Sequence, residues 1–337
     1  MTSSPAPRSH ELLATARARA LAGGWDDVRR MLATHDDVVL THPELTTLRA
    51  EAELRTGHPR EARTWLMMAL PKLQLSGDRA ALRTAVNYLG VADAELGALD
   101  EAQLVFSRVL EMAQLDGDDL LLARATNNLG TIANMRGDRA KALTLYQLAV
   151  PAYQRLGNTN GLAESYHNIA ISYRYLGQLA RADEYEQQAI HFAREARSPR
   201  LLALGRLERA EISLRSGDAA LAEAGARRAV SEFDTLGDEI RKGDALRLAA
   251  AAALSLGRLE LAREAVESAL TLARQHGSAL NEAEALFVRA QLAAASHLMR
   301  EAAEDARATL AIYERLGAAA ERATVEEWLT RNIAPEG

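Results

Sequence analysis

The feature that most constrains this chain is a glycine that recurs every 40 residues. The first series consists of Gly57, Gly97, Gly137, Gly177, Gly217 and Gly257, and His297 stands at its next position. A second series lies between them, with Arg197 at its one irregular position: Gly77, Gly117, Gly157, Gly237, Gly277 and Gly317. Glycine ends helices well, because the left-handed backbone conformation found there is strained for a residue with a side chain. Each 40-residue unit therefore predicts two antiparallel helices.

Small residues follow the same period. An alanine stands five residues after each position of the first series, at Ala62, Ala102, Ala142, Ala182, Ala222, Ala262 and Ala302. Seven residues before each position stands Ala50, Gly90, Gly130, Ala170, Ala210, Ala250 or Ala290. Two helices approach closely only where the facing side chains are small, so this pattern predicts a tight seam within each pair.

These positions, together with aromatic residues and further alanines in the second helices, resemble the tetratricopeptide-repeat motif. The additional matches are Phe106, Tyr146, Ala69, Ala149, Ala189, Ala229 and Ala269. Internal repeats of about this length are typical of stacked helical arrays. The resemblance covers nearly the whole chain and implies an all-α, right-handed superhelical solenoid. We expect about eight helix pairs and a C-terminal capping helix.

The two ends depart from the repeat. We expect residues 1–8, which are rich in Ser and Pro, to form a disordered tail, with Ser9 capping a helix from His10 to about Leu21. A return helix over Trp25 to Ala33 completes a shortened pair, so residues 9–42 are predicted to cap the array. Residues 319–337 are predicted to form the C-terminal capping helix and tail, with Trp328 on its apolar side.

Seven repeats are expected to occupy residues 43–318. Their predicted bounds are about 43–78, 79–118, 119–158, 159–198, 199–238, 239–278 and 279–318. Pro71 and Pro151 lie at the same place in two second helices, where we expect each to kink or break its helix.

Composition limits the function classes. The 337 residues include no cysteine and carry a formal net charge of −6, which argues against a general nucleic-acid or anionic-membrane binder. No apolar run approaches the length of a membrane span, and the N-terminus lacks the apolar core of a signal peptide. We therefore expect a cytoplasmic protein with no nucleic-acid or membrane partner.

Enzymatic signatures are missing from the sequence. It contains no P-loop, no dinucleotide-binding glycine pattern after a strand and no H-E-x-x-H motif. Glu164 and His167 form a single E-x-x-H, which helical di-iron proteins need twice. We expect a protein that is not an enzyme and that holds neither a metal nor a cofactor.

The candidate site follows from the resemblance. In tetratricopeptide proteins that bind peptides, the first helices line the concave surface, and the same register selects ten residues here. They are Asn87, Arg124, Asn127, Asn128, Thr131, Asn134, His167, Asn168, Arg174 and Tyr175. Asparagine is unfavourable inside helices, so its repetition on first helices points to a role beyond folding.

The chemistry of these side chains suits an extended peptide. A carboxamide can pair with both the N–H and the C=O of a backbone, and Arg124 and Arg174 can donate to a carboxylate. The pattern resembles the Asn ladders of kinesin light chains, of cell-polarity adaptors and of bacterial quorum-sensing peptide receptors. The Lys and Asn of the family's carboxylate clamp are replaced by Asn87 and Val91, or by Asn127 and Thr131. As an alternative, the asparagines bond across neighbouring helices and stiffen the stack.

Beyond residue 198 the same register gives charges of both signs among apolar residues. These residues are Leu204, Leu207, Glu208, Glu211, Arg215, Asp244, Arg247, Leu248, Glu284, Phe287 and Gln291; we expect them to form a solvated face, with a second contact surface as the alternative. The sequence thus predicts a non-catalytic module that binds a peptide or a partner's tail in a concave groove. The alternative is a sensor, similar to quorum-sensing receptors and maltose-type activators, whose superhelix changes on ligand binding and acts on a separate effector. The oligomeric state stays open.

Overall fold

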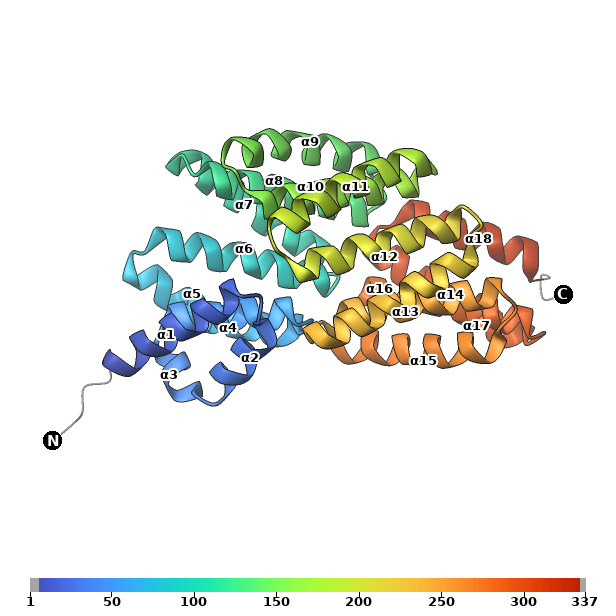
Figure 1. Cartoon of the computed structure of the whole chain (residues 1–337), viewed down its shortest axis with the longest axis horizontal. Helices are drawn as coiled ribbons and strands as arrows, with labels where there is room; N and C mark the ends of the chain where they lie inside the picture. Colours follow the sequence, from blue (N-terminus) through green and yellow to red (C-terminus); the bar gives the residue numbers. More distant parts are fainter. Residues whose placement is uncertain (1–5, 334–337) are drawn as a thin grey trace.

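The structure, a computed structural model, describes residues 6–333 (Figure 1). Eighteen α-helices and no strands occupy these residues. The first helices of successive pairs are α4 (Pro43–Arg55), α6 (Arg79–Glu95), α8 (Asp119–Met135), α10 (Thr159–Tyr175), α12 (Pro199–Arg215), α14 (Glu239–Ser255) and α16 (Ala279–Ala295). The second helices are α5 (Pro59–Ser76), α7 (Leu99–Asp116), α9 (Arg139–Arg155), α11 (Leu179–Glu195), α13 (Ala219–Leu236), α15 (Leu259–His276) and α17 (Met299–Leu316). The chain is a helical repeat solenoid.

The N-terminal part has three helices instead of the expected two. They are α1 (Ala6–Leu21), α2 (Trp25–Ala33) and α3 (Asp36–Thr41). Because α1 begins at Ala6, the predicted start at His10 and the predicted tail 1–8 are wrong for residues 6–8, and Ser9 lies within the helix. Residues 1–5 of that tail lie outside the described residues. The short α3 places Val39 in the core, where Thr46 Oγ1 donates to its carbonyl at 2.6 Å.

The C-terminal helix α18 (Ala319–Asn332) covers the last pair. Val325 is buried, and the Trp328 ring meets Phe287 edge to face with centroids 5.5 Å apart. Residues 334–337 of the predicted tail lie outside the described residues.

Pro71 and Pro151 do not break their helices. Both α5 and α9 continue through the proline on either side, so the expected break is absent. After four glycines of the second series, the side chain of the next residue caps the following helix; these residues are Asp78, Asp118, Asn158 and Asp238. The carboxylate of Asp118, for example, accepts from the Leu121 N–H at 3.0 Å.

The alanine seam is buried as its spacing predicts. All seven alanines that follow the first glycine series are 0% exposed. Opposite them, Gly90 and Gly130 lie against aromatic rings of the second helices. A Cβ at Gly130 would come within 2.6 Å of Tyr146. These close approaches fix how each pair of helices packs.

Successive turns of the superhelix touch one another, which the sequence does not predict. A Cβ on Gly57 would lie 2.7 Å from the backbone N of Ile240. Gly97 likewise meets Ala279, and Gly137 meets Ala320. Each of these three glycines, in a connection between two helices, therefore contacts the start of a helix that lies 182 or 183 residues further along the chain. The N-terminal helices consequently lie beside those of the C-terminal third (Figure 1).

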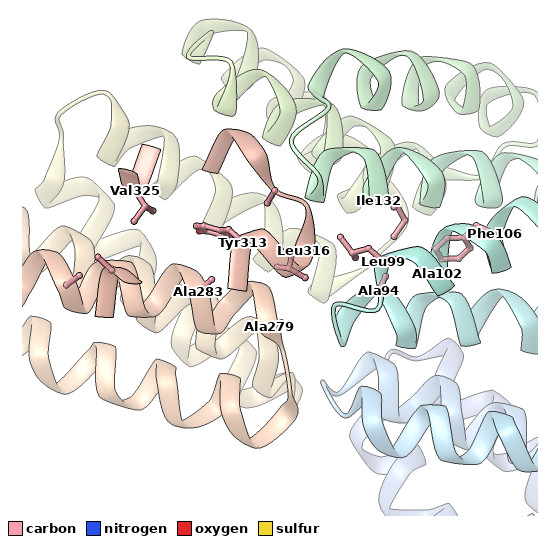
Figure 2. Packing of buried hydrophobic residues seen from close by; sticks show 13 residues of the cluster. Ala94, Leu99, Ala102, Phe106, Ile132, Ala279, Ala283, Tyr313, Leu316 and Val325 are labelled. Atoms are coloured by element: carbon pink, nitrogen blue, oxygen red, sulfur yellow. The ribbon is translucent and has the colours of Figure 1, made fainter. Parts of the chain in front are cut away.

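An apolar cluster joins the two turns in the middle of the molecule. Figure 2 shows Leu99 and Phe106 of α7 and Ile132 of α8 on one side of it, with Tyr313 and Leu316 of α17 on the other. All five side chains are buried. Their burial removes apolar surface from water and so holds the turns together.

Two histidines lie at another contact between the turns. The rings of His58 and His276 meet edge to face, with centroids 4.9 Å apart. Burial, together with Arg29 and the second histidine, lowers the pKa of His58 to about 4, and burial also lowers the pKa of His276. Both imidazoles are therefore favoured in their neutral forms when the turns are in contact.

The contact at Gly57 predicts a difference between two glycines. Gly257 has a similar backbone, with φ of 71° against 80° at Gly57, but no atom lies near its missing Cβ. Gly257→Ala should cost about 1–2 kcal/mol from backbone strain alone. Gly57→Ala should cost about 1–3 kcal/mol more, because the methyl group meets the backbone of the other turn. Urea unfolding of both variants measures the difference, and equal losses would show that the turns do not meet at Gly57.

The histidine contact predicts acid sensitivity. The unfolded chain binds protons at these residues near pH 6.5, whereas the folded chain binds them only at lower pH. The contribution of the two histidines to the free energy of unfolding should therefore be complete above pH 6.5 and should be lost as the pH falls toward 4. The measurement compares unfolding free energies of the wild type and of His58→Asn/His276→Asn across this range. Parallel pH curves for the two proteins would contradict the assignment.

Candidate functional site

The first helices surround one central cavity of about 1380 Å³. Residues from every first helix, α4 to α16, line it, together with residues of α1, α2, α7, α9, α13, α17 and α18. The cavity is the concave side of the solenoid. Within residues 6–333, no helix is both long enough and apolar enough to cross a membrane.

All ten residues predicted from the repeat register line this cavity. They come from α6, α8 and α10 because the same face of each first helix points toward the superhelix axis. The register thus selects residues that line the concave surface, and their role in binding stays a prediction. The hydrogen bonds of these side chains decide which of them are open to a ligand.

Several of the asparagines bond across neighbouring first helices. Asn128 Nδ2 donates to Asn87 Oδ1 at 3.0 Å, and Ser165 Oγ donates to Asn127 Oδ1 at 3.0 Å. Asn134 Oδ1 accepts from Ser172 Oγ and from Arg139. One polar atom of each of these carboxamides is therefore used between neighbouring helices, as the alternative interpretation predicts.

Three other predicted residues are held by acidic partners. Arg174 Nε donates to Glu208 at 2.6 Å, and its guanidinium also lies 3.8 Å from Glu211. His167 Nδ1 lies 3.0 Å from the fully buried Glu186, and Tyr175 Oη donates to Glu284 at 3.0 Å. These carboxylates bind the polar groups of Arg174, His167 and Tyr175 that a ligand would need. Arg174 is therefore not available as the carboxylate donor that the sequence suggested.

Some polar groups on the wall keep their capacity for a ligand. Among residues 6–333, no hydrogen bond or ion pair reaches the guanidinium of Arg124, which is exposed to the cavity. The carboxamide of Asn168 is also without a partner in this part of the chain. Thr131 also lines the cavity, and its hydroxyl donates to the Asn127 carbonyl. Arg124 and Asn168 are thus the two of these side chains whose polar groups have no partner among residues 6–333.

The later repeats form a buried charge network, so the expected solvated face is wrong. Glu211 is 7% exposed and lies 3.0 Å from Arg247, which also contacts Glu284 at 3.1 Å. Burial would raise the pKa of Glu211, but Arg247, Arg174 and Arg215 lower it to about 2. Burial raises the pKa of Asp244 to about 6 despite Arg241 at 2.8 Å. These charges hold α10, α12, α14 and α16 together.

A signal for this network is present in the sequence. Its pairs join successive repeats at nearly constant separations, such as 34 residues for Arg174 and Glu208 and 36 for Arg247 and Glu211. Opposite charges slightly less than one repeat apart on first helices therefore indicate contacts between neighbouring repeats. The sequence analysis treated each repeat separately and missed them.

Other polar pairs cross the superhelix between distant repeats. Arg241 of α14 donates to Glu95 of α6 at 2.6 Å, and Arg139 of α9 pairs with Glu321 of α18. Arg55 of α4 lies 3.8 Å from Glu164 of α10. Since Glu164 is bound in this way, its E-x-x-H spacing with His167 reflects two separate contacts. The cavity is therefore bridged between turns at several points.

Comparison with known proteins supports the fold. The family model described as tetratricopeptide repeat matches residues 121–195. Comparison of the sequence with curated proteins gave no match. Among solved structures, a Rap protein complexed with competence and sporulation factor has a TM-score of 0.62 at 11% identity, covering 97% of this chain and 99% of that one.

Two further structures share the arrangement of helices. The Rap conjugation gene regulator of plasmid pLS20, in complex with a Phr peptide, has a TM-score of 0.66 at 13% identity over 90% of this chain and 79% of that one. A signal-transduction ATPase with a tetratricopeptide-repeat sensor from Pyrococcus horikoshii has a TM-score of 0.52 at 16% identity, over 78% and 42%. Residues 121–195 are tetratricopeptide repeats, and the described chain as a whole has the fold of a tetratricopeptide-repeat array.

Proposed function

We propose that this protein is a non-catalytic recognition module that binds an extended peptide, or the tail of a partner protein, inside the central cavity. The observation that carries the proposal is the open polar wall formed by α6, α8 and α10. Arg124 and Asn168 have no partner among residues 6–333, and Asn128 keeps its Oδ1 free. Such groups can pair with the N–H and C=O groups of an extended backbone.

The remaining wall supports this function by being rigid. Asn87, Asn127 and Asn134 are tied to neighbouring helices, so the open groups project from a fixed frame. A preorganised wall loses little conformational freedom when a ligand binds. Two proteins of the same fold, at 11% and 13% identity, were solved with a bound factor or peptide, which is consistent with the proposal.

A sensor that responds to its ligand is the second candidate. It is favoured by the pairs that cross the cavity, because a ligand entering there would alter contacts between the turns. The Arg55–Glu164 pair is the most exposed of them, with about a third of each side chain accessible at 35% and 38%. Exposed ion pairs contribute little stability, so this bridge can be opened at low cost.

The peptide hypothesis predicts that Arg124→Ala/Asn168→Ala abolishes partner capture while the protein stays folded. Neither side chain forms a hydrogen bond or ion pair with residues 6–333, so the Tm should be nearly unchanged. The measurement is capture from a lysate of the native host by the immobilised wild type and variant, followed by mass spectrometry. A protein or peptide recovered by the wild type alone is the expected result.

A matched control is available on the outer helices. Arg108 of α7 and Gln147 of α9 are exposed, lie outside the cavity, and are close in type to the two residues changed. Arg108→Ala/Gln147→Ala should recover the same partner as the wild type. If the cavity variant also recovers it, binding does not use this wall and the proposal fails.

The sensor hypothesis predicts a change in shape. Once a captured peptide is identified, small-angle scattering of the free and peptide-bound protein should show a different radius of gyration, because the bridges between turns would be rearranged. An identical scattering profile in both states would leave the passive module as the correct description.

A further inference from the structure

Arg197 occupies a backbone position that the chain otherwise reserves for glycine. From residue 77 to residue 317, every position of the second series except 197 is a glycine, and each of these glycines has a positive φ. Arg197 adopts the same conformation, with φ of 50°. This region is strained for residues with a Cβ, and strained residues of this kind gather at functional sites.

The strain at Arg197 is not offset by contacts of its side chain within the fold. Its guanidinium is exposed and forms no hydrogen bond or ion pair with residues 6–333, although it lines the central cavity. The neighbouring Pro199 lies 3.9 Å from the position of a Cβ at Gly23, where the N-terminal helices approach. Arg197 therefore stands at the edge of the cavity where the two turns meet.

The charges of the lining point to the kind of ligand. Every carboxylate on the lining has an arginine within 4.0 Å, as Glu164 has Arg55 and Glu95 has Arg241. Of the arginines on the lining, Arg124 and Arg197 are the two that have no carboxylate partner among residues 6–333. The charge left unbalanced on this surface is therefore positive.

Both arginines lie along the same side of the wall. Arg124 is in the second turn of α8, and Arg197 lies two residues before Pro199, the first residue of α12, so each stands near the N-terminal end of a first helix. Such ends carry a partial positive charge that adds to the attraction for an anion. Between them lies α10, capped by Asn158, whose side chain accepts from the Gly161 N–H at 2.8 Å.

We propose that the ligand is an acidic peptide whose carboxylate side chains are bound by Arg124 and Arg197. This inference rests on the proposed peptide-binding function and names its ligand class. Arginine suits the task because its planar guanidinium donates two parallel hydrogen bonds to a carboxylate. An acidic ligand would also be drawn toward a lining whose own carboxylates are already neutralised.

The test uses pools of short synthetic peptides that are acetylated and amidated, so that only side chains carry charge. One pool contains Asp and Glu at its charged positions, a second contains Lys and Arg, and a third contains Asn and Gln. Fluorescence anisotropy with the full chain should show the acidic pool binding about tenfold more tightly than the neutral pool. A fourth, acidic pool with free C-termini should bind no more tightly than its amidated counterpart.

Two glycine variants separate binding from folding. Arg197→Gly restores the residue of the repeat, so it should raise the Tm and weaken binding of the acidic pool about tenfold. His297→Gly is the matched control, because His297 also has a positive φ, of 61°, but lies outside the cavity. It should raise the Tm and leave binding unchanged. Arg124→Gln should weaken the acidic pool as Arg197→Gly does.

The outcomes distinguish the two proposals. If no pool binds the wild type, the peptide-binding function fails, and the acidic ligand with it. If the neutral or basic pool binds at least as well as the acidic pool, the function stands and the acidic ligand is overturned. Tighter binding of the acidic pool with free C-termini would show that the arginines bind a terminal carboxylate, and it would overturn the proposed binding of the peptide's carboxylate side chains. Equal acidic binding by the wild type and Arg197→Gly would remove Arg197 from the site.

Discussion

The close approach of helices at small residues is the constraint on which the rest of this structure depends. Because alanine or glycine occupies the seam of every pair, the helices pack at a repeated geometry and each repeat adds the same rotation. After about four and a half repeats this rotation brings the chain back against itself, so that Gly57 reaches Ile240 and Gly97 reaches Ala279. The cavity exists because the turn closes around it.

Closure also explains the distribution of charge. Arginine and glutamate side chains on the first helices would be solvated in an open array, but here they face one another across a confined space. Buried charges are tolerated only when they are paired, and Arg247 with Glu211 and Glu284 shows the pairing expected. Arg124 and Arg197 line the same cavity but are exposed and have no carboxylate partner among residues 6–333, and this is why they carry the argument about the ligand.

Much of the fold could be predicted from the sequence, because the period of glycine and alanine specifies local geometry. The register also placed all ten candidate residues on one wall. The contact between turns could not be predicted, since it depends on the accumulated rotation of several repeats and not on any one of them. For the same reason the sequence could not show that Arg174 is bound by Glu208 or that Glu211 is buried. The third short helix, α3, carries no repeat signal.

The contacts between turns have a consequence for how the chain folds. In an open repeat array each unit touches only its neighbours, so segments can unfold one after another from either end. Here the Leu99 and Leu316 side chains share one cluster although they lie in distant repeats. Loss of either end therefore exposes apolar surface in the middle of the chain. The array should behave as one cooperative unit, and closure should follow the formation of the local helix pairs, because it joins residues far apart in the sequence.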